Sequence, residues 1–80
     1  MQRDEFIIWL ATTDWYQCGS SDRYWERIVD HANFIKEEID VRSNSVVLSY
    51  PEFDLGEEWR TKEFTFGDFA KAFENYEHTI

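Results

Sequence analysis

Apolar side chains recur along residues 22–39 at the spacing of an amphipathic helix. Such a stripe predicts a helix that buries one face, and its members are Trp25, Ile28, Val29, Ala32, Ile35 and Ile39. Ser20, Ser21 and Asp22 precede the stripe and can cap the first turn. We therefore predict that residues 22–39 form the longest helix of the chain, with Tyr24, His31 and Phe34 beside the buried stripe.

Two shorter helices are predicted near the ends of the chain. In residues 4–13, Asp4 can act as a cap and the apolar side chains share one face. A strand remains open there, because residues 6–10 form a short apolar run whose periodicity fits either structure. Residues 68–77 place Phe69, Ala72, Phe73 and Tyr76 on one side, which predicts a closing helix.

Residues 45–50 and 58–66 are typical of strands, because they are rich in β-branched and aromatic residues. The segment between them contains Pro51, Asp54 and Gly56 and is too long for a tight hairpin turn. We expect the two strands to be antiparallel neighbours, with Phe64 and Phe66 on one face. The predicted order is helix, helix, strand, strand, helix, a small α+β domain with helices packed on a short antiparallel sheet.

The chain has 80 residues, of which 42% are hydrophobic. This length is sufficient for a single domain over residues 1–80 with one core, and the apolar content favours a folded chain despite the charge. Fifteen residues are aromatic, including four Trp. Large rings bury much area in a small core, but Trp and Tyr also anchor protein interfaces, so both roles remain open.

Cys18 is the only cysteine. An internal disulfide and a cysteine-rich zinc site are therefore excluded. The N-terminal apolar run is short and follows acidic residues, unlike a signal peptide or a membrane span. We expect a reducing cytoplasm, or the cytoplasm of a host cell if the chain is encoded by a phage, and no membrane association.

The formal net charge is −9, from 17 acidic and 8 basic residues. Direct binding to DNA, RNA or anionic lipid is disfavoured, because those affinities depend on Lys and Arg. A basic protein partner is favoured by long-range attraction. The alternative is that the acidity only keeps the chain soluble.

Most of the acidic excess follows residue 36, in two clusters that we predict to bind a partner. The first cluster ends the predicted long helix, where the helix dipole disfavours acids; the second lies between the predicted strands and includes an aromatic ring. Their residues are Glu37, Glu38 and Asp40, and Glu52, Phe53, Asp54, Glu57 and Glu58. The alternatives are that the first cluster is merely solvated and that Phe53 returns to the core.

Candidate catalytic and metal-binding residues are few. Neither His31 nor His78 has a neighbouring nucleophile in a known motif, and Cys18 lies several residues before the predicted helix start that would activate it. Asp22, Glu26 and Asp30 would form a straight acidic line along the predicted helix, which does not converge on one ion. We therefore predict no enzyme activity, no cofactor and no metal site.

These observations favour a binding protein that inhibits a basic nucleic-acid-handling protein, such as a nuclease. Carboxylates spaced over a small surface can take the place of phosphates in a basic groove. In size and acidity the chain is similar to phage anti-restriction and anti-CRISPR proteins and to bacterial nuclease-immunity proteins, although no motif identifies any of those families. The alternative is a small adaptor or assembly subunit that binds through exposed aromatics. The sequence leaves the oligomeric state open.

Overall fold

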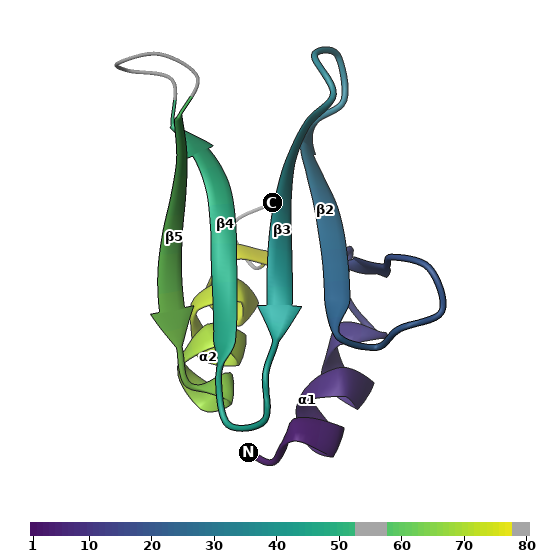
Figure 1. Ribbon diagram of the computed structural model, residues 1–80, viewed down its shortest axis with the longest axis vertical. Helices are drawn as coiled ribbons and strands as arrows, with labels where there is room; N and C mark the ends of the chain where they lie inside the picture. Colours follow the sequence, from purple (N-terminus) through teal and green to yellow (C-terminus); the bar gives the residue numbers. More distant parts are fainter. Residues whose placement is uncertain (53–57, 78–80) are drawn as a thin grey trace.

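Five antiparallel strands form one sheet in the computed structural model, which describes residues 1–52 and 58–77 (Figure 1). Each strand pairs with its neighbour in the sequence, so the order across the sheet is β1-β2-β3-β4-β5. The elements are α1 (Arg3–Leu10), β1 (Tyr16–Gln17), β2 (Tyr24–Asp30), β3 (Ile35–Val41), β4 (Val46–Glu52), β5 (Glu58–Phe64) and α2 (Phe66–Glu77).

The predicted helix over 22–39 is wrong, and with it the predicted helix-helix-strand-strand-helix fold. This segment forms β2, a turn and β3, which pair from Tyr24↔Asp40 to Asp30↔Ile35 with a bulge after Ile28. Only part of the predicted stripe is buried, since Trp25 and Ile39 lie in the core whereas Val29 and Ala32 are exposed. Residues 1–52 and 58–77 form a five-stranded meander, with one short helix before it and one after it.

The physical reason for the error is a buried charge. Alternate residues of β2 point into the core, and one of these inward positions is held by Arg27, which is only 8% exposed. Its guanidinium donates to Glu37 across the hairpin at 2.6 Å, so both strands carry a charge where alternation predicts an apolar residue. Because these charges interrupt the alternation of apolar and polar residues, the remaining apolar residues fit a helical spacing. The β-branched content of β2 and β3 does favour strands; these residues include Ile28, Val29, Ile35 and Val41.

The other four predicted elements are confirmed within a few residues. The region 4–13 is helical as α1, and the backbone N–H of Gln2 donates to Glu5 as the first turn begins. The predicted strands 45–50 and 58–66 appear as β4 and β5, which are antiparallel neighbours. The closing helix begins slightly earlier than predicted, because the hydroxyl of Thr65 accepts from the N–H of Asp68 and caps α2. Phe66 is therefore helical and not part of β5.

Both helices pack on one face of the sheet, which we call the inner face (Figure 1). The rings of Phe6 in α1 and Phe66 in α2 stack with centroids 4.9 Å apart. Phe69, completely buried, meets Phe6 edge-on at 5.5 Å. Beneath these rings lie the inward side chains of the central strands, and the buried core consists of Phe6, Leu10, Trp15, Trp25, Ile39, Val41, Val46, Leu48, Phe66 and Phe69.

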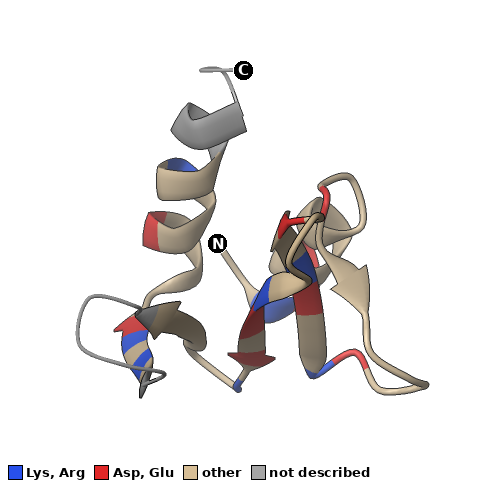
Figure 2. Ribbon diagram, turned by 90° about the horizontal axis from the view of Figure 1, so that it is seen from above, with Lys and Arg blue, Asp and Glu red and all other residues tan. Residues whose placement is uncertain are grey.

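No helix of the described residues covers the opposite face of the sheet, which we call the open face. Figure 2 looks along the strands and shows α2 rising from the inner side alone. The β3–β4 ladder ends at Glu38↔Ser49, whereas β2–β3 and β4–β5 continue to Asp30↔Ile35 and Glu52↔Glu58. The two hairpins therefore separate toward the end that holds the β2–β3 turn, which we call the hairpin end (Figure 1).

Candidate binding surface

The first predicted acidic cluster lies on β3, and its three members face two ways. Glu37 points to the inner face and pairs with Arg27, while Glu38 and Asp40 point to the open face. The helix C-terminus that was expected to disfavour these acids is absent, because residues 37–40 are strand. The structure thus brings Glu38 and Asp40 together on one surface and places Glu37 on the other.

Two arginines hold Asp40 tightly on the open face. Arg23 donates through Nε at 2.6 Å and through Nη2 at 3.1 Å, and Arg42 Nε adds a contact at 3.4 Å. The hydrogen bond from Arg23 lowers the pKa of Asp40 below its ordinary value, with a further contribution from Arg42. Its charge is therefore largely balanced within the molecule.

Lys36 balances the other two acids of this region. Its ammonium lies 3.1 Å from a carboxylate oxygen of Glu26 and 3.8 Å from one of Glu38. Burial opposes ionisation of Glu26, but hydrogen bonds from Cys18, Lys36 and Tyr16 outweigh it and lower its pKa. Basic and acidic residues consequently lie side by side on β2 and β3, as Figure 2 shows in blue and red.

The second predicted cluster is described only at its borders. Glu52 and Glu58 form the last backbone pair of the β4–β5 ladder, at the hairpin end. Phe53, Asp54 and Glu57 lie outside the described residues. Trp59 follows directly, paired with Pro51 on the open face and 53% exposed, so an accessible indole accompanies the two glutamate positions.

The hairpin end also carries an aromatic ring that the sequence prediction assigned to the flank of a helix. Phe34 ends the β2–β3 turn with 82% of its surface exposed and a positive φ of 54°. The signal that could have identified it is the turn sequence itself, in which Asp30 and Asn33 are typical turn residues. Asp30 accepts hydrogen bonds from the N–H groups of Ala32 and Asn33.

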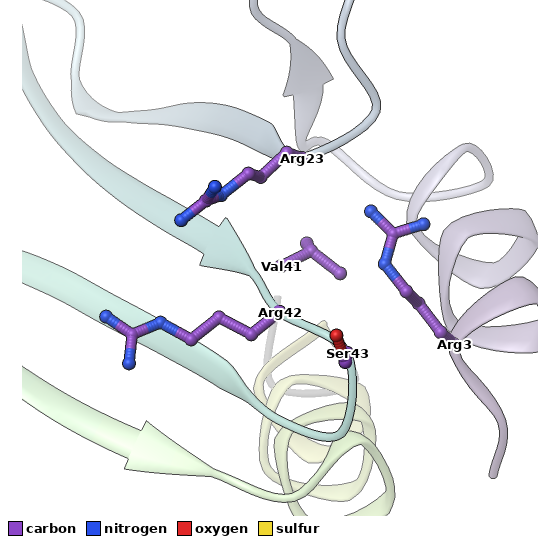
Figure 3. A pocket seen from close by; sticks show the side chains of 5 residues that line it. All are labelled: Arg3, Arg23, Val41, Arg42 and Ser43. Atoms are coloured by element: carbon purple, nitrogen blue, oxygen red, sulfur yellow. The ribbon is translucent and has the colours of Figure 1, made fainter.

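A cavity of about 450 Å³ lies at the other end of the sheet, lined by Arg3, Arg23, Val41, Arg42 and Ser43. Three arginines around one space would suit an anion, but their charged groups do not converge. Figure 3 shows Arg23 and Arg42 extending to one side, away from Arg3. The former two meet Asp40, and Arg3 pairs with Asp22 at 3.0 Å.

The candidate nucleophile Cys18 is poorly suited to catalysis. It lines a second cavity of about 270 Å³ beside Tyr24 and Glu26. Burial, together with the adjacent Glu26 carboxylate, raises the pKa of the thiol to about 11. A thiol with such a pKa is almost entirely protonated at neutral pH and is a weak nucleophile.

The remaining chemical candidates are dispersed. The acidic line predicted along a helix is absent, because its three members have separate roles. Asp22 pairs with Arg3 and Glu26 pairs with Lys36. Asp30 accepts a hydrogen bond from Asn33 in the β2–β3 turn. His31 is exposed in that turn. Within residues 1–52 and 58–77, no three His, Cys, Asp or Glu side chains gather closely enough to hold a metal ion. No helix in this part of the chain is both long and apolar enough to cross a membrane.

Comparison with protein-family models, curated proteins and solved structures finds no match. The distinctive part of the surface is the hairpin end, where exposed rings accompany acidic positions.

Proposed function

We propose that this chain is a non-enzymatic binding protein that covers a basic surface of a nucleic-acid-handling protein, such as a nuclease, and thereby inhibits it. The observation that carries this proposal is the charge balance. Ion pairs in the described part of the chain already engage five of the eight basic side chains, namely Arg3, Arg23, Arg27, Lys36 and Arg42. The net charge of −9 therefore rests on acids outside these pairs.

The position of the acidic residues along the sequence favours the hairpin end as the contact. Four acids lie close together in the sequence from Glu52 to Glu58 with no base among them. On β2 and β3, by contrast, ion pairs with basic side chains engage Glu26, Glu37, Glu38 and Asp40. Closely spaced carboxylates can occupy positions that phosphates take in a basic groove, and their attraction to such a groove acts over about 10 Å at 0.1 M salt. Trp59 supplies an apolar contact beside them.

The chemistry of the described residues gives little support to catalysis. A nucleophilic active site needs an activated nucleophile in a cleft, whereas Cys18 is a protonated thiol. We place the binding activity in the cytoplasm, because an unpaired cysteine is typical of a reducing compartment.

The decisive test is recovery of partners on the immobilised chain at about 0.05 M and about 1 M NaCl, where the Debye length falls from ~14 Å to ~3 Å. We expect a basic nuclease or another nucleic-acid-binding protein that is retained at low salt and lost at high salt. The purified partner should lose its activity on nucleic acid when the chain is added. Recovery of salt-resistant partners without a basic surface would contradict the proposal.

A charge-reversal variant locates the contact. Substituting Glu52, Asp54, Glu57 and Glu58 with Lys should abolish binding to that partner at low salt. The matched control reverses four exposed acids elsewhere, Asp4, Asp14, Glu63 and Asp68, which changes the net charge equally. Equal losses in both variants would mean that only the overall charge acts, and an unchanged affinity in the first variant would exclude the hairpin end.

An adaptor or assembly role is the second candidate, and one observation favours it. Three aromatic side chains of the open face are about half exposed: Tyr16, Tyr24 and Trp59. Binding through such rings depends on apolar burial and tolerates high salt. A stable oligomer or complex at about 1 M NaCl, lost in Trp59→Ala, would favour this role over the first.

A further inference from the structure

The β2–β3 turn exposes a strained phenylalanine. Phe34 is the one non-glycine residue with a positive φ in the part of the chain that the structure describes. In this region the β-carbon approaches the carbonyl oxygen, so glycine or asparagine is favoured and a bulky side chain is a genuine outlier. Since 82% of Phe34 is exposed, packing within the molecule does not compensate for the strain.

The turn is braced so that the ring is presented in a fixed place. The Asp30 carboxylate accepts from the N–H groups of Ala32 at 3.0 Å and Asn33 at 3.4 Å, and from Asn33 Nδ2 at 2.8 Å. The backbone pair Asp30↔Ile35 closes the loop. A phenylalanine has only two side-chain torsions, so little further freedom would be lost when the ring is buried by a partner.

The position of Phe34 agrees with the acidic contact surface proposed above. Its turn lies at the hairpin end, where the Glu52↔Glu58 pair ends the neighbouring ladder (Figure 1). Beyond Glu38↔Ser49, β3 is no longer paired with β4, and Phe34 is 82% exposed. An apolar anchor within a polar rim is the usual arrangement of a binding surface.

We propose that Phe34 is the anchor of the interface and inserts its ring into an apolar pocket on a protein partner whose rim carries Lys or Arg. The basic rim rests on the function proposed above, whereas the insertion of the ring rests on the exposure, strain and bracing of the turn. A bilayer is a poorer occupant, because the acidic net charge repels anionic lipid. A second copy of the chain is also disfavoured as the partner, because two chains with the same acidic net charge repel each other.

The test compares four immobilised baits in one lysate: the wild-type chain, Phe34→Asn, Phe34→Tyr and Ile8→Gln. Asparagine removes the ring but suits the positive φ, and tyrosine restores a ring. Ile8 is a matched control, since it is 69% exposed but lies on α1. Circular dichroism confirms that each bait is folded. Bound proteins are quantified by mass spectrometry, and the affinity of the purified partner is measured by calorimetry.

We expect a partner that is enriched on the wild-type, Phe34→Tyr and Ile8→Gln baits and lost on Phe34→Asn, with an affinity at least about 30-fold weaker for the asparagine variant. Identical proteins on all four baits, or none enriched over Phe34→Asn, would overturn the proposal. So would wild-type self-association that Phe34→Asn abolishes, or binding to phosphatidylcholine vesicles that depends on the ring.

The outcomes also separate this inference from the function on which it partly rests. A basic, salt-sensitive partner that binds Phe34→Asn normally would support the proposed function and overturn the anchor. A partner that requires the ring but has no basic surface and resists high salt would support insertion of the ring and overturn both the basic rim and the proposed function.

Discussion

Replacing Phe34 with asparagine should stabilise the fold, although it removes a large apolar side chain. A left-handed conformation costs an ordinary L-residue about 1–2 kcal/mol, and asparagine avoids part of this because its short polar side chain bonds locally. The opposing loss is small, because only about one fifth of the side chain is buried and full burial of a phenylalanine contributes about 1.5–3 kcal/mol. The lost burial is therefore about 0.3–0.6 kcal/mol.

The net expectation is a gain of about 0.5–1 kcal/mol in the free energy of unfolding for Phe34→Asn, and a smaller gain for glycine, whose unfolded chain is more flexible. In a domain of this size that gain raises the melting temperature by about 3–6 °C. Urea unfolding followed by tryptophan fluorescence, together with thermal circular dichroism, measures both quantities.

The control is Val29→Asn, which makes a similar change in an exposed strand residue of the same hairpin without a positive φ. It should be neutral or destabilising, since asparagine is disfavoured in strands. A loss of more than about 0.5 kcal/mol in Phe34→Asn would refute the argument from backbone strain.

Three further predictions concern the charged groups and the thiol. Glu37→Gln should lower the free energy of unfolding by about 2–3 kcal/mol, because it leaves the buried guanidinium of Arg27 without this carboxylate. The control Glu38→Gln, on the open face, should change it by less than about 0.5 kcal/mol. Urea titration of both variants measures the two values. The pKa of Asp40 is lowered from 3.8 by its arginine partners, so its stabilising contribution is complete above that pH and is lost as the pH falls through the folded-state pKa; Asp40→Asn should lose less stability below pH 3.8 than the wild type. Cys18, with a pKa of about 11, should react with iodoacetamide slowly at neutral pH and faster as the pH approaches that value. Glu26→Gln should shift the dependence of this rate on pH to lower pH. Rapid alkylation at neutral pH would contradict a raised pKa of the thiol.

The sequence predicted most of the elements but not the fold. Strands β4 and β5 are rich in β-branched and aromatic residues, and α1 and α2 carry apolar residues on one face. Their local signals therefore indicate the elements that the structure has. Residues 22–39 carry two signals. Their apolar spacing fits a helix, and the alternation that would identify strands is hidden, because Arg27 and Glu37 neutralise each other inside the sheet.

The sequence predicted which acids would belong to a candidate binding surface, but it located only some of them correctly. Glu38 and Asp40 were identified as surface acids, but their arginine and lysine partners come from neighbouring strands and could not be known without the register. Phe34 was placed beside the stripe of the predicted helix, because that helix was predicted to continue through the turn, although Asp30 and Asn33 are typical turn residues.

The meander has a consequence for how the chain folds during synthesis. Each strand pairs only with its sequence neighbour, so the hairpins need no distant segment and can form quickly. The rings that cover the inner face, however, come from opposite ends of the chain: Phe6 from the first helix and Phe66 and Phe69 from the last. A nascent chain on the ribosome can thus build its sheet early, but it exposes an uncovered apolar face until translation delivers α2. An apolar face exposed in that interval is prone to aggregation, which a chaperone can limit.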